Sequence, residues 1–420
     1  MADAREPVEV TIAIGNEELL AGTLWVHDRQ AQSATFRYDH NYLAHPLAYA
    51  LDPTLPLVAG VIQTRPGKAM FNAFSDGAPD RWGQNLMRRQ ERGRADAAGT
   101  RPRTLTNADF LLGTHDELRQ GATRLRRPGT TDYWSGATHG VPRLVSLPRL
   151  LNASDHLSDD HPDTQDIRDL VHAGSSLGGA RPKASVLTKR GELAIAKFPH
   201  RGGDEWDVPG WEKLETDLAV RAGINTASTE LVQVQGSNVL ISQRFDRKGR
   251  HRVGFASALT MLEASDGDRR SYLEIAGVAE VHSSQAGADL AELYRRVVFS
   301  AMTANTDDHL RNHGFLRNNN GWRLAPAYDL NPNPDNPGRL STAIDLDDGT
   351  CNVDLVLSVA GYFRLSDDDA RKVVTEVETA TRDWRVHAQA LGLARVEVTR
   401  MEQAFENDFR REASRIGRAR

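Results

Sequence analysis

The sequence contains a single cysteine, Cys351, and no apolar run long enough to cross a membrane. One cysteine cannot form a disulfide within the chain, and a lone cysteine is more often a core residue than a nucleophile. A transmembrane helix needs about 20 consecutive apolar residues, whereas a long apolar stretch of this chain, 353–360, already includes Asp354. The first residues, Met1 to Pro7, contain no apolar signal core. These features predict a cytoplasmic protein that has no contact with a membrane.

The chain also lacks an excess of charge of one sign. It has 52 Lys and Arg against 57 Asp and Glu, which gives a formal net charge of −5. This balance provides no overall basic charge to drive nucleic-acid binding, and no helix-turn-helix pattern stands out. With 420 residues, 39% of them apolar and 26% charged, the composition is that of a soluble globular protein with two or three domains.

The first 130 residues are rich in patterns typical of β-strands. Apolar and polar residues alternate in short runs that are separated by turn residues. A turn with helix-capping residues precedes the first long helix. The arginines at the end of this region are expected to form a solvated face. The predicted elements are a hairpin over 8–26, a strand over 34–38, helices over 80–92 and 107–113, and a strand over 119–126.

A glycine-rich loop precedes a strand in the middle of the chain. Residues 174–182 are mostly small and include Gly178 and Gly179, and such a loop lets backbone N–H groups approach phosphates without side-chain clashes. The loop lacks the patterns of P-loops and of kinase glycine loops, and taken alone it is more typical of a hairpin turn. Lys197 ends the next strand, where protein kinases keep a phosphate-binding lysine, and this favours the phosphate interpretation.

Helices are expected to dominate the rest of the chain. The first, over 211–220, offers Glu212 or Glu215 as a partner for Lys197, although exposed surface glutamates are the alternative interpretation. Strands are predicted over 231–234 and 239–247, and the second of these leads into helical sequence. The later helices are predicted over 257–264, 271–279, 285–304, 367–391 and 396–416. We divide the chain into domains at 1–130, 140–250 and 251–420.

A cluster of polar residues follows the longest predicted helix. Asp307 and Asn312 are five residues apart, which is the spacing of the catalytic aspartate and the metal-binding asparagine in protein kinases. Asp329 follows a short apolar run at the separation of a kinase's second metal ligand. The alternative is an Asp- and Asn-rich turn that caps a helix, but the second acid and the upstream lysine favour the kinase interpretation.

At four ordered motifs the chain resembles the HipA family, the kinase-like toxins of bacterial type II toxin–antitoxin modules. The resemblance covers nearly the whole chain and includes the β-rich N-terminal region, through the segments 22–24 and 74–83. The motifs that carry it are Ser176-Leu177-Gly178-Gly179-Ala180-Arg181-Pro182-Lys183, Arg244-Phe245-Asp246-Arg247, Asn305-Thr306-Asp307-Asp308-His309 with Asn312, and Ala327-Tyr328-Asp329-Leu330-Asn331-Pro332.

The resemblance implies an α+β fold of the two-lobed protein-kinase type, with a β-rich N-terminal subdomain and a mostly helical C-terminal lobe. It implies transfer of the ATP γ-phosphate to serine or threonine with Mg²⁺. By this resemblance Asp307 is the catalytic aspartate, His309 belongs to the catalytic loop, and Asn312 and Asp329 bind the metal. The implied ATP-binding residues are Gly178, Gly179, Ala180, Arg181, Pro182, Lys183, Lys197, Gln243, Arg244, Phe245, His309, Asn312, Tyr328 and Asp329.

The resemblance also implies regulation and partners. Ser176 matches the family's inhibitory autophosphorylation serine, and since Ser175 directly precedes it, which hydroxyl is modified stays open. The expected partners are a helix-turn-helix antitoxin similar to HipB, operator DNA bound through that antitoxin, and a protein substrate such as an aminoacyl-tRNA synthetase.

Three alternatives to a protein kinase are kept. The first is a scaffold that binds ATP and acts with the antitoxin in transcriptional control but has lost catalysis. The second is a metal-dependent hydrolase that uses Asp307, Asp308, His309 and His313 as ligands, although it would need neither the lysine strand nor the glycine loop. The third is transfer of phosphate to a small molecule.

Overall fold

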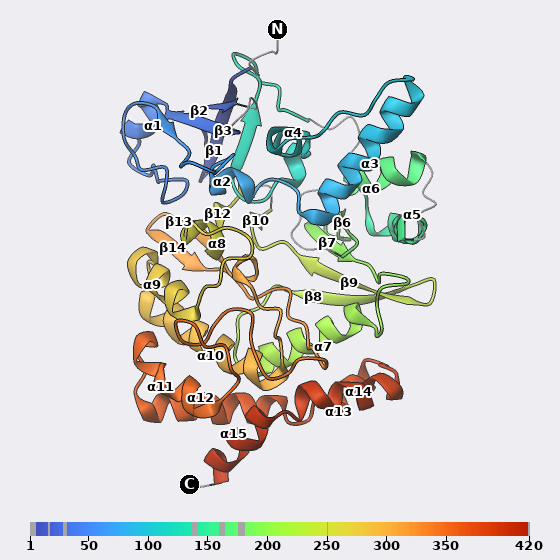
Figure 1. The fold of residues 1–420 in the computed structure, drawn as a ribbon, viewed down its shortest axis with the longest axis vertical. Coiled ribbons are helices and arrows are strands. Elements are labelled where there is room, and N and C mark those ends of the chain that lie inside the picture. Colours follow the sequence, from blue (N-terminus) through green and yellow to red (C-terminus); the bar gives the residue numbers. More distant parts are fainter. Residues whose placement is uncertain are drawn as a thin grey trace. The chain divides into compact units, whose positions relative to one another are not determined.

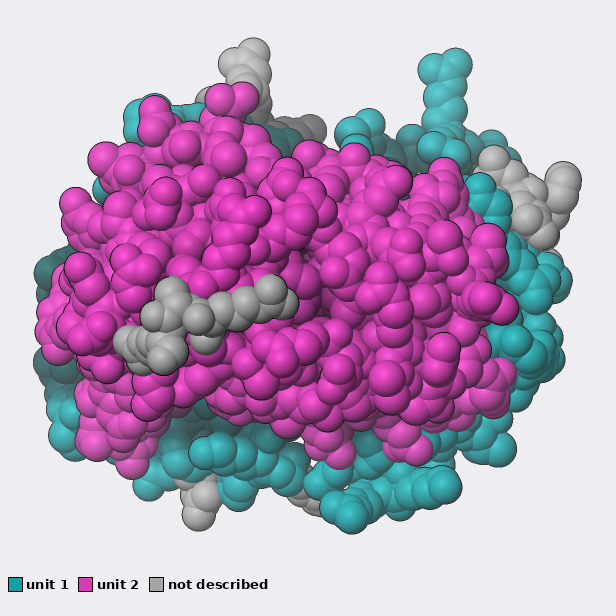
Figure 2. Space-filling view, turned by 90° about the horizontal axis from the view of Figure 1, so that it is seen from below, with its two compact units in different colours: residues 1–203, 234–237, 246–256 teal, residues 204–233, 238–245, 257–420 magenta. Residues whose placement is uncertain are grey.

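The fold is described from a computed structural model of the full chain, over residues 6–15, 17–27, 32–135, 141–158, 164–174, 181–249 and 251–418 (Figure 1). The described residues form two compact units, and each is considered by itself. Unit 1 comprises residues 1–203, 234–237 and 246–256, and unit 2 comprises 204–233, 238–245 and 257–420; they are teal and magenta in Figure 2. Within the described residues, no helix has both the length and the apolarity to cross a membrane.

Unit 1 begins with an antiparallel five-stranded sheet in the order β4-β3-β2-β1-β5. The predicted hairpin and third strand are present, whereas the predicted strand over 119–126 is shorter and begins at Thr123. Val8, Val10 and Ile12 alternate along β1, so they share one face of the sheet, and all three are fully buried. The strands are β1 (Val8–Ile14), β2 (Glu17–His27), β3 (Ser33–Tyr38), β4 (Ile62–Gln63) and β5 (Thr123–Arg126).

Glycine is required at one position of this sheet. In the pairing of β1 with β2, Gly22 lies opposite Val10, next to a β-bulge. A Cβ atom at Gly22 would lie 2.3 Å from the carbonyl oxygen of Arg37 on β3. Any larger residue would therefore push the central strands apart.

Helical segments lie between and after the strands of this sheet in the sequence. The helix α3 begins at Arg81 because the carboxylate of Asp80 accepts a hydrogen bond from the backbone N–H of Gly83 at 2.7 Å. The helix α6 was not predicted from the sequence. The helical segments of unit 1 are α1 (His40–Ala44), α2 (Asn72–Ser75), α3 (Arg81–Ala97), α4 (Asn107–Gly113), η1 (Asp116–Leu118), η2 (Leu144–Ser146), α5 (Leu147–Ser158) and α6 (Thr164–Gly174).

Unit 1 also contains two further hairpins. The strands β6 (Lys183–Leu187) and β7 (Leu193–Lys197) are antiparallel, and their register places Lys183 directly opposite Lys197. The short strands β10 (Arg247–Lys248) and β11 (His251–Arg252) form the second hairpin.

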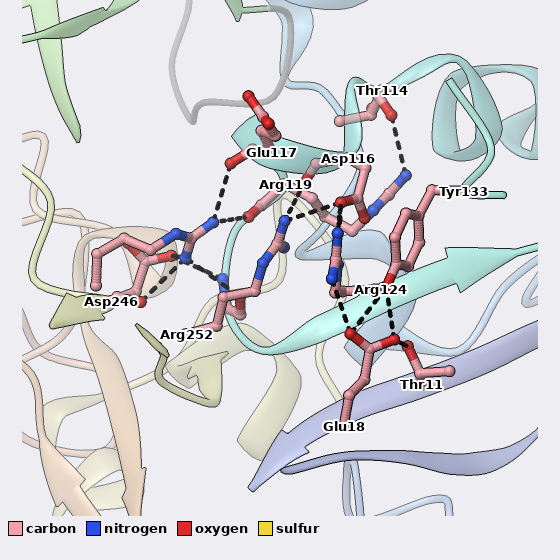
Figure 3. Close-up of polar contacts among 12 residues, drawn as sticks. Thr11, Glu18, Thr114, Asp116, Glu117, Arg119, Arg124, Tyr133, Asp246 and Arg252 are labelled. Carbon is pink, nitrogen blue, oxygen red and sulfur yellow. Dashed lines mark hydrogen bonds and ion pairs between the residues drawn. The ribbon is translucent and has the colours of Figure 1, made fainter. Parts of the chain in front are cut away.

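A network of arginines and acids ties this second hairpin to the N-terminal sheet (Figure 3). Asp116, which is 2% exposed, binds Arg124 on β5 at 2.5 Å and Arg252 on β11 at 3.1 Å. Asp246 accepts a hydrogen bond from the backbone N–H of Gly121 at 2.7 Å. The second half of the Arg244–Arg247 motif is therefore a structural anchor within unit 1.

The sequence analysis predicted that Arg119 belongs to a solvated face, and for this residue the prediction is wrong. It is 1% exposed, and its guanidinium donates to the backbone carbonyls of Gly77, Leu111 and Thr114 at 3.0–3.1 Å. Burial lowers the pKa of Arg119 to about 10, so the side chain is still protonated at neutral pH. The arginine fastens the segment before α3 to the turn that precedes β5.

Unit 2 is mostly helical, and its helix α10 is largely buried. The strands β13 and β14 form a hairpin in this unit. The predicted helix over 367–391 is in fact two helices with a break at Arg382 and Asp383. The strands are β8 (Thr229–Val234), β9 (Ser237–Gln243), β13 (Gly314–Asn318) and β14 (Gly321–Leu324), and β12 (Phe255–Ser257) lies at the unit boundary. The helical segments are α7 (Val208–Arg221), α8 (Ala258–Met261), α9 (Tyr272–His282), α10 (Ala286–Thr303), η3 (Leu310–Asn312), α11 (Val353–Ser358), η4 (Ala360–Phe363), α12 (Asp367–Thr381), α13 (Trp384–Ala390), α14 (Arg395–Phe405) and α15 (Asp408–Arg418).

The predicted helix over 396–416 is also divided, and Asn407 explains the division. Its side-chain amide donates to the carbonyls of Ala301 at 3.0 Å and Ala404 at 2.9 Å, while its side-chain oxygen accepts from the N–H of Arg410. This residue therefore ends α14, starts α15 and attaches both to the end of α10. Pattern alone could not show the break, because the apolar periodicity continues across it.

An aromatic cluster holds the helices of unit 2 together. The ring of Trp211 on α7 lies 6.2 Å from those of Trp384 and Phe405, and all three are fully buried. Trp384 and Phe405 stack at 4.5 Å. The segment 204–221, distant in sequence, is thus part of the same core as the C-terminal helices.

Candidate active site

The polar loop begins where α10 ends. Ala304 adopts a left-handed conformation with φ of 54°, which stops the helix. Asn305, 1% exposed, follows at once, and its side chain donates to Ser300 at 3.2 Å and accepts from the backbone N–H of Asn331 at 3.0 Å. The end of the helix is therefore bound to the segment that follows Asp329.

Two adjacent acids in this loop have opposite environments. Asp307 is exposed, whereas Asp308 is 3% exposed and accepts hydrogen bonds from Tyr272 and, at 3.1 Å, from His313. Burial opposes ionisation of Asp308, but the charge and hydrogen bond of His313 and the hydroxyl of Tyr272 outweigh it, so the pKa of Asp308 lies below its ordinary value. Asp308 is therefore held inside the fold, and of the two acids Asp307 is the one open to solvent.

The hairpin β13–β14 returns the chain from Asn312 to Asp329. Phe315 pairs with Leu324, and below that pair the N–H of Ala325 donates to the carbonyl of Gly314 at 2.8 Å. The hydroxyl of Tyr328 then donates to the carbonyl of Arg311 at 2.6 Å. The residue before Asn312 thus contacts the residue before Asp329, and the two predicted metal ligands are brought to the same end of the hairpin.

Asp329 has φ of 60°, a region that residues other than glycine seldom adopt. Such strain persists only where the surroundings fix it, and it is common at functional sites. Here Arg296 on α10, 4% exposed, donates to the carbonyl of Ala325 at 2.8 Å and supports the segment that leads to Asp329.

A small cavity borders this segment, and Asn312 and Tyr328 both line it. Its remaining lining residues are Ile224, Arg296, Phe299, Ser300, Asp308, His313, Ala327 and Leu330. The aromatic ring of Phe245 lies 5.3 Å from that of Tyr328. Among the predicted ATP-binding residues, Phe245 therefore packs beside the segment that contains Asp329, while Gln243 is exposed and Arg244 is buried.

The predicted phosphate-binding residues lie in unit 1. Lys197 is half-buried at the end of β7, opposite Lys183, and Arg181 and Pro182 precede β6. The ammonium of Lys183 forms a buried ion pair with Asp80 at 3.1 Å. Ser175, Ser176, Gly178, Gly179 and Ala180 lie outside the described residues. Lys197 belongs to unit 1 and Asp307 to unit 2, and their grouping in one site stays a prediction.

The two glutamates offered as partners for Lys197 are both buried on α7. Glu215 is fully buried, and burial raises the pKa of its carboxyl well above the ordinary value. Arg410 and Thr303 lie close enough to lower it in part. Glu212 is 4% exposed, so neither residue is the exposed surface glutamate of the alternative interpretation.

The hydrolase alternative does not fit this geometry. It requires Asp308 and His313 to bind one metal ion together with Asp307 and His309, yet Asp308 and His313 are buried and bind each other. Among the described residues, no three His, Cys, Asp or Glu side chains are grouped so that they could hold a metal ion.

A comparison with protein families decides the assignment. The family model for the HipA-like C-terminal domain matches residues 175–384, a range that contains the polar loop, the hairpin and Asp329. The chain belongs to this family. The resemblance inferred from the motifs is thereby confirmed.

Two curated relatives from Sinorhizobium fredii are similar to parts of the chain. One, named "Putative kinase Y4mE", is 26% identical over 182 residues, which are 37% of this chain and 41% of the relative. The other, named "Putative kinase Y4dM", is 31% identical over 128 residues, which are 30% of this chain and 29% of the relative. The matched regions thus span less than half of these relatives.

The solved complex of the Shewanella oneidensis toxin–antitoxin system HipA and HipB with operator DNA contains a chain of similar fold. The TM-score is 0.68 at 17% identity, and the match covers 98% of this chain and 99% of that one. At this identity the likeness shows the fold alone. The predicted α+β, HipA-like fold is confirmed, whereas the roles of individual site residues stay predictions.

Proposed function

We propose that this protein is a serine/threonine protein kinase that uses ATP and Mg²⁺ and acts as the toxin of a type II toxin–antitoxin module. The observation that carries the proposal is the hairpin β13–β14, which lies between Asn312 and Asp329 in the sequence. The hydroxyl of Tyr328 donates to the carbonyl of Arg311, so the residue before Asp329 contacts the residue before Asn312, and Asp307 is exposed.

The donor set fits Mg²⁺, which prefers carboxylate and amide oxygens and is usually held by one or two carboxylates together with substrate phosphates. Asn312 and Asp329 would hold the ion, and when bound it neutralises charge on the β- and γ-phosphates. Asp307 would accept the proton of the substrate hydroxyl. His309, which is also exposed, would be a further residue of the catalytic loop.

ATP would be bound by two groups of residues. Lys197, Lys183, Arg181, Pro182 and the loop 178–180 would bind the phosphates, and Gln243, Arg244, Phe245 and Tyr328 would surround the adenine. Support for the last group comes from the packing of Phe245 against Tyr328. The names of the two curated relatives support kinase activity in general, and the presence of Asp307, Asn312, Asp329 and Lys197 argues against an inactive scaffold.

Regulation would involve a serine before the glycine loop. Phosphorylation of Ser176, or of Ser175, would add about −1.5 to −2 charges at pH 7 where the loop must receive the phosphates of ATP. Like-charge repulsion would then favour an outward loop that cannot bind nucleotide. Mass spectrometry after incubation with Mg-ATP tests this, and active enzyme that leaves both serines unmodified would contradict it.

The proposed partner is a helix-turn-helix antitoxin similar to HipB, which would also supply contact with operator DNA. The support is that the structurally similar chain was solved with HipB and its operator. The proposed substrate is a protein of translation, with aminoacyl-tRNA synthetases as the first class to examine.

Transfer of label from γ-labelled ATP to protein is the deciding experiment. The wild-type chain should label itself or an added aminoacyl-tRNA synthetase, and Asp307→Asn should not. If the wild-type chain binds Mg-ATP and an antitoxin but labels no protein, the inactive scaffold is the correct interpretation.

A further inference from the structure

Asp80 belongs to a motif of the N-terminal region, yet its side chain contacts the strand that follows the glycine loop. One carboxylate oxygen accepts from the N–H of Gly83 at 2.7 Å and caps α3, and the other binds the ammonium of Lys183 at 3.1 Å. The side chains of Asp80 and Lys183 are only 8% and 5% exposed. The carboxylate is therefore fixed by a helix end on one side and by a buried lysine on the other.

The register of β6 and β7 places a second lysine beside this pair. Lys183 and Lys197 are directly opposite each other, so their side chains lie on the same face of the hairpin. Two like charges at opposed positions repel each other, and a buried ammonium without a counter-charge is costly. The carboxylate of Asp80 offsets both effects and holds the ammonium of Lys183 in place.

We propose that Asp80 is a positioning residue for nucleotide binding, which holds the ammonium of Lys183 next to that of Lys197 so that the two bind the phosphates of ATP together. This inference rests on the proposed kinase function. It gives the N-terminal subdomain an indirect part in the site, since the residue that caps α3 also fixes the direction of a phosphate-binding lysine.

The chain offers a substitution that separates charge from capping. Asparagine is as good an N-cap as aspartate, so Asp80→Asn keeps the hydrogen bond to Gly83 and removes only the charge that faces Lys183. Lys183→Met removes the other partner. A matched control is Asp39→Asn, which makes the same change at the carboxylate that caps α1 through the N–H of Asn41 at 2.8 Å.

The measurement is binding of Mg-ATP and of adenosine to the full chain by titration calorimetry, with a thermal melt to verify folding. Asp80→Asn and Lys183→Met should each weaken Mg-ATP binding about tenfold or more, and Asp39→Asn should leave it unchanged. Adenosine binding should be the same in all variants, because adenosine has no phosphates. The double variant should bind Mg-ATP no more weakly than Lys183→Met alone, since both changes remove one interaction.

Three results would overturn the proposal: unchanged Mg-ATP affinity in a folded Asp80→Asn protein, equal losses for ATP and adenosine, or losses that simply add in the double variant. These are distinct from failure of the proposed function. If the wild-type chain does not bind Mg-ATP at all, the kinase assignment itself is wrong.

Discussion

Neighbouring side chains of the polar loop have separate tasks, and burial distinguishes them. Asp307 is exposed, whereas Asp308 is enclosed by Tyr272 and His313. The sequence shows the spacing of Asp307, Asn312 and Asp329, because that pattern is local. It could not show the role of Asp308, whose partner Tyr272 is 36 residues away.

Asp307→Asn should reduce phosphoryl transfer by about a hundredfold or more, because the amide cannot accept the hydroxyl proton. Mg-ATP binding and thermal stability should stay close to the wild-type values, since the side chain is exposed. Transfer is measured with γ-labelled ATP and binding by calorimetry. Near-wild-type transfer by the folded variant would remove Asp307 from the catalytic role.

Asp308→Asn, unlike Asp307→Asn, should destabilise the fold. The free energy of unfolding should fall by about 3 kcal/mol at pH 7, since the change breaks a buried hydrogen-bonded pair. The pKa of Asp308 is lowered in the folded state, so its stabilising effect is complete above the ordinary carboxyl pKa of about 3.9 and is lost as the pH falls below it. The difference between variant and wild type, measured by urea unfolding, should therefore shrink in acid. A constant difference from pH 7 to pH 3 would contradict this assignment.

At the scale of elements, the hairpin β13–β14 connects the segments that contain Asn312 and Asp329. It was not predicted, although Asn320-Gly321 between two apolar runs is a strong hairpin signal. The long helices, by contrast, were predicted in position but not in their breaks, since contacts of Asn407 with α10 decide where α14 ends. Local periodicity thus predicts which residues are helical, while distant hydrogen bonds set the ends.

Tyr328→Phe tests the hairpin's role at the site. The change removes the hydrogen bond to the carbonyl of Arg311 and keeps the ring that packs against Phe245. A net loss of about 1 kcal/mol corresponds to about a fivefold weaker Mg-ATP affinity, if the bond holds Asn312 and Asp329 together. Tyr362→Phe, at a side chain that is 66% exposed on η4, is the matched control. Equal affinities for both variants would show that the bond does not organise the site.

For the whole molecule, neither compact unit is a continuous stretch of the sequence, and each is built from three separate segments. The backbone passes between the units at 203/204, 233/234, 237/238, 245/246 and 256/257. A division into consecutive domains, such as 1–130, 140–250 and 251–420, cannot express this, because composition and linker signals are read along the chain. That three-part division stays a prediction.

Two fragments of the chain test whether the C-terminal region is a separate domain. Residues 257–420 lack Trp211, which is fully buried against Trp384 and Phe405, and loss of such a side chain costs about 3–5 kcal/mol. This fragment should show no cooperative thermal transition by near-UV circular dichroism, whereas 204–420, which restores α7, should show one. A cooperative transition of 257–420 at the same temperature would show that the C-terminal region is an independent domain.

The hairpin β13–β14 also affects how related sequences should be compared. Its base is fixed by the pairing of Phe315 with Leu324 and by the contact of Arg311 with Tyr328, while its tip at 319–320 is remote from both. Residues added in matched pairs to the two arms would lengthen the tip and leave the base in place. The number of residues between the positions of Asn312 and Asp329 can therefore differ among related sequences. An alignment that penalises gaps evenly would overlook relatives whose hairpin is longer, whereas one that anchors both arms at the base would retain them.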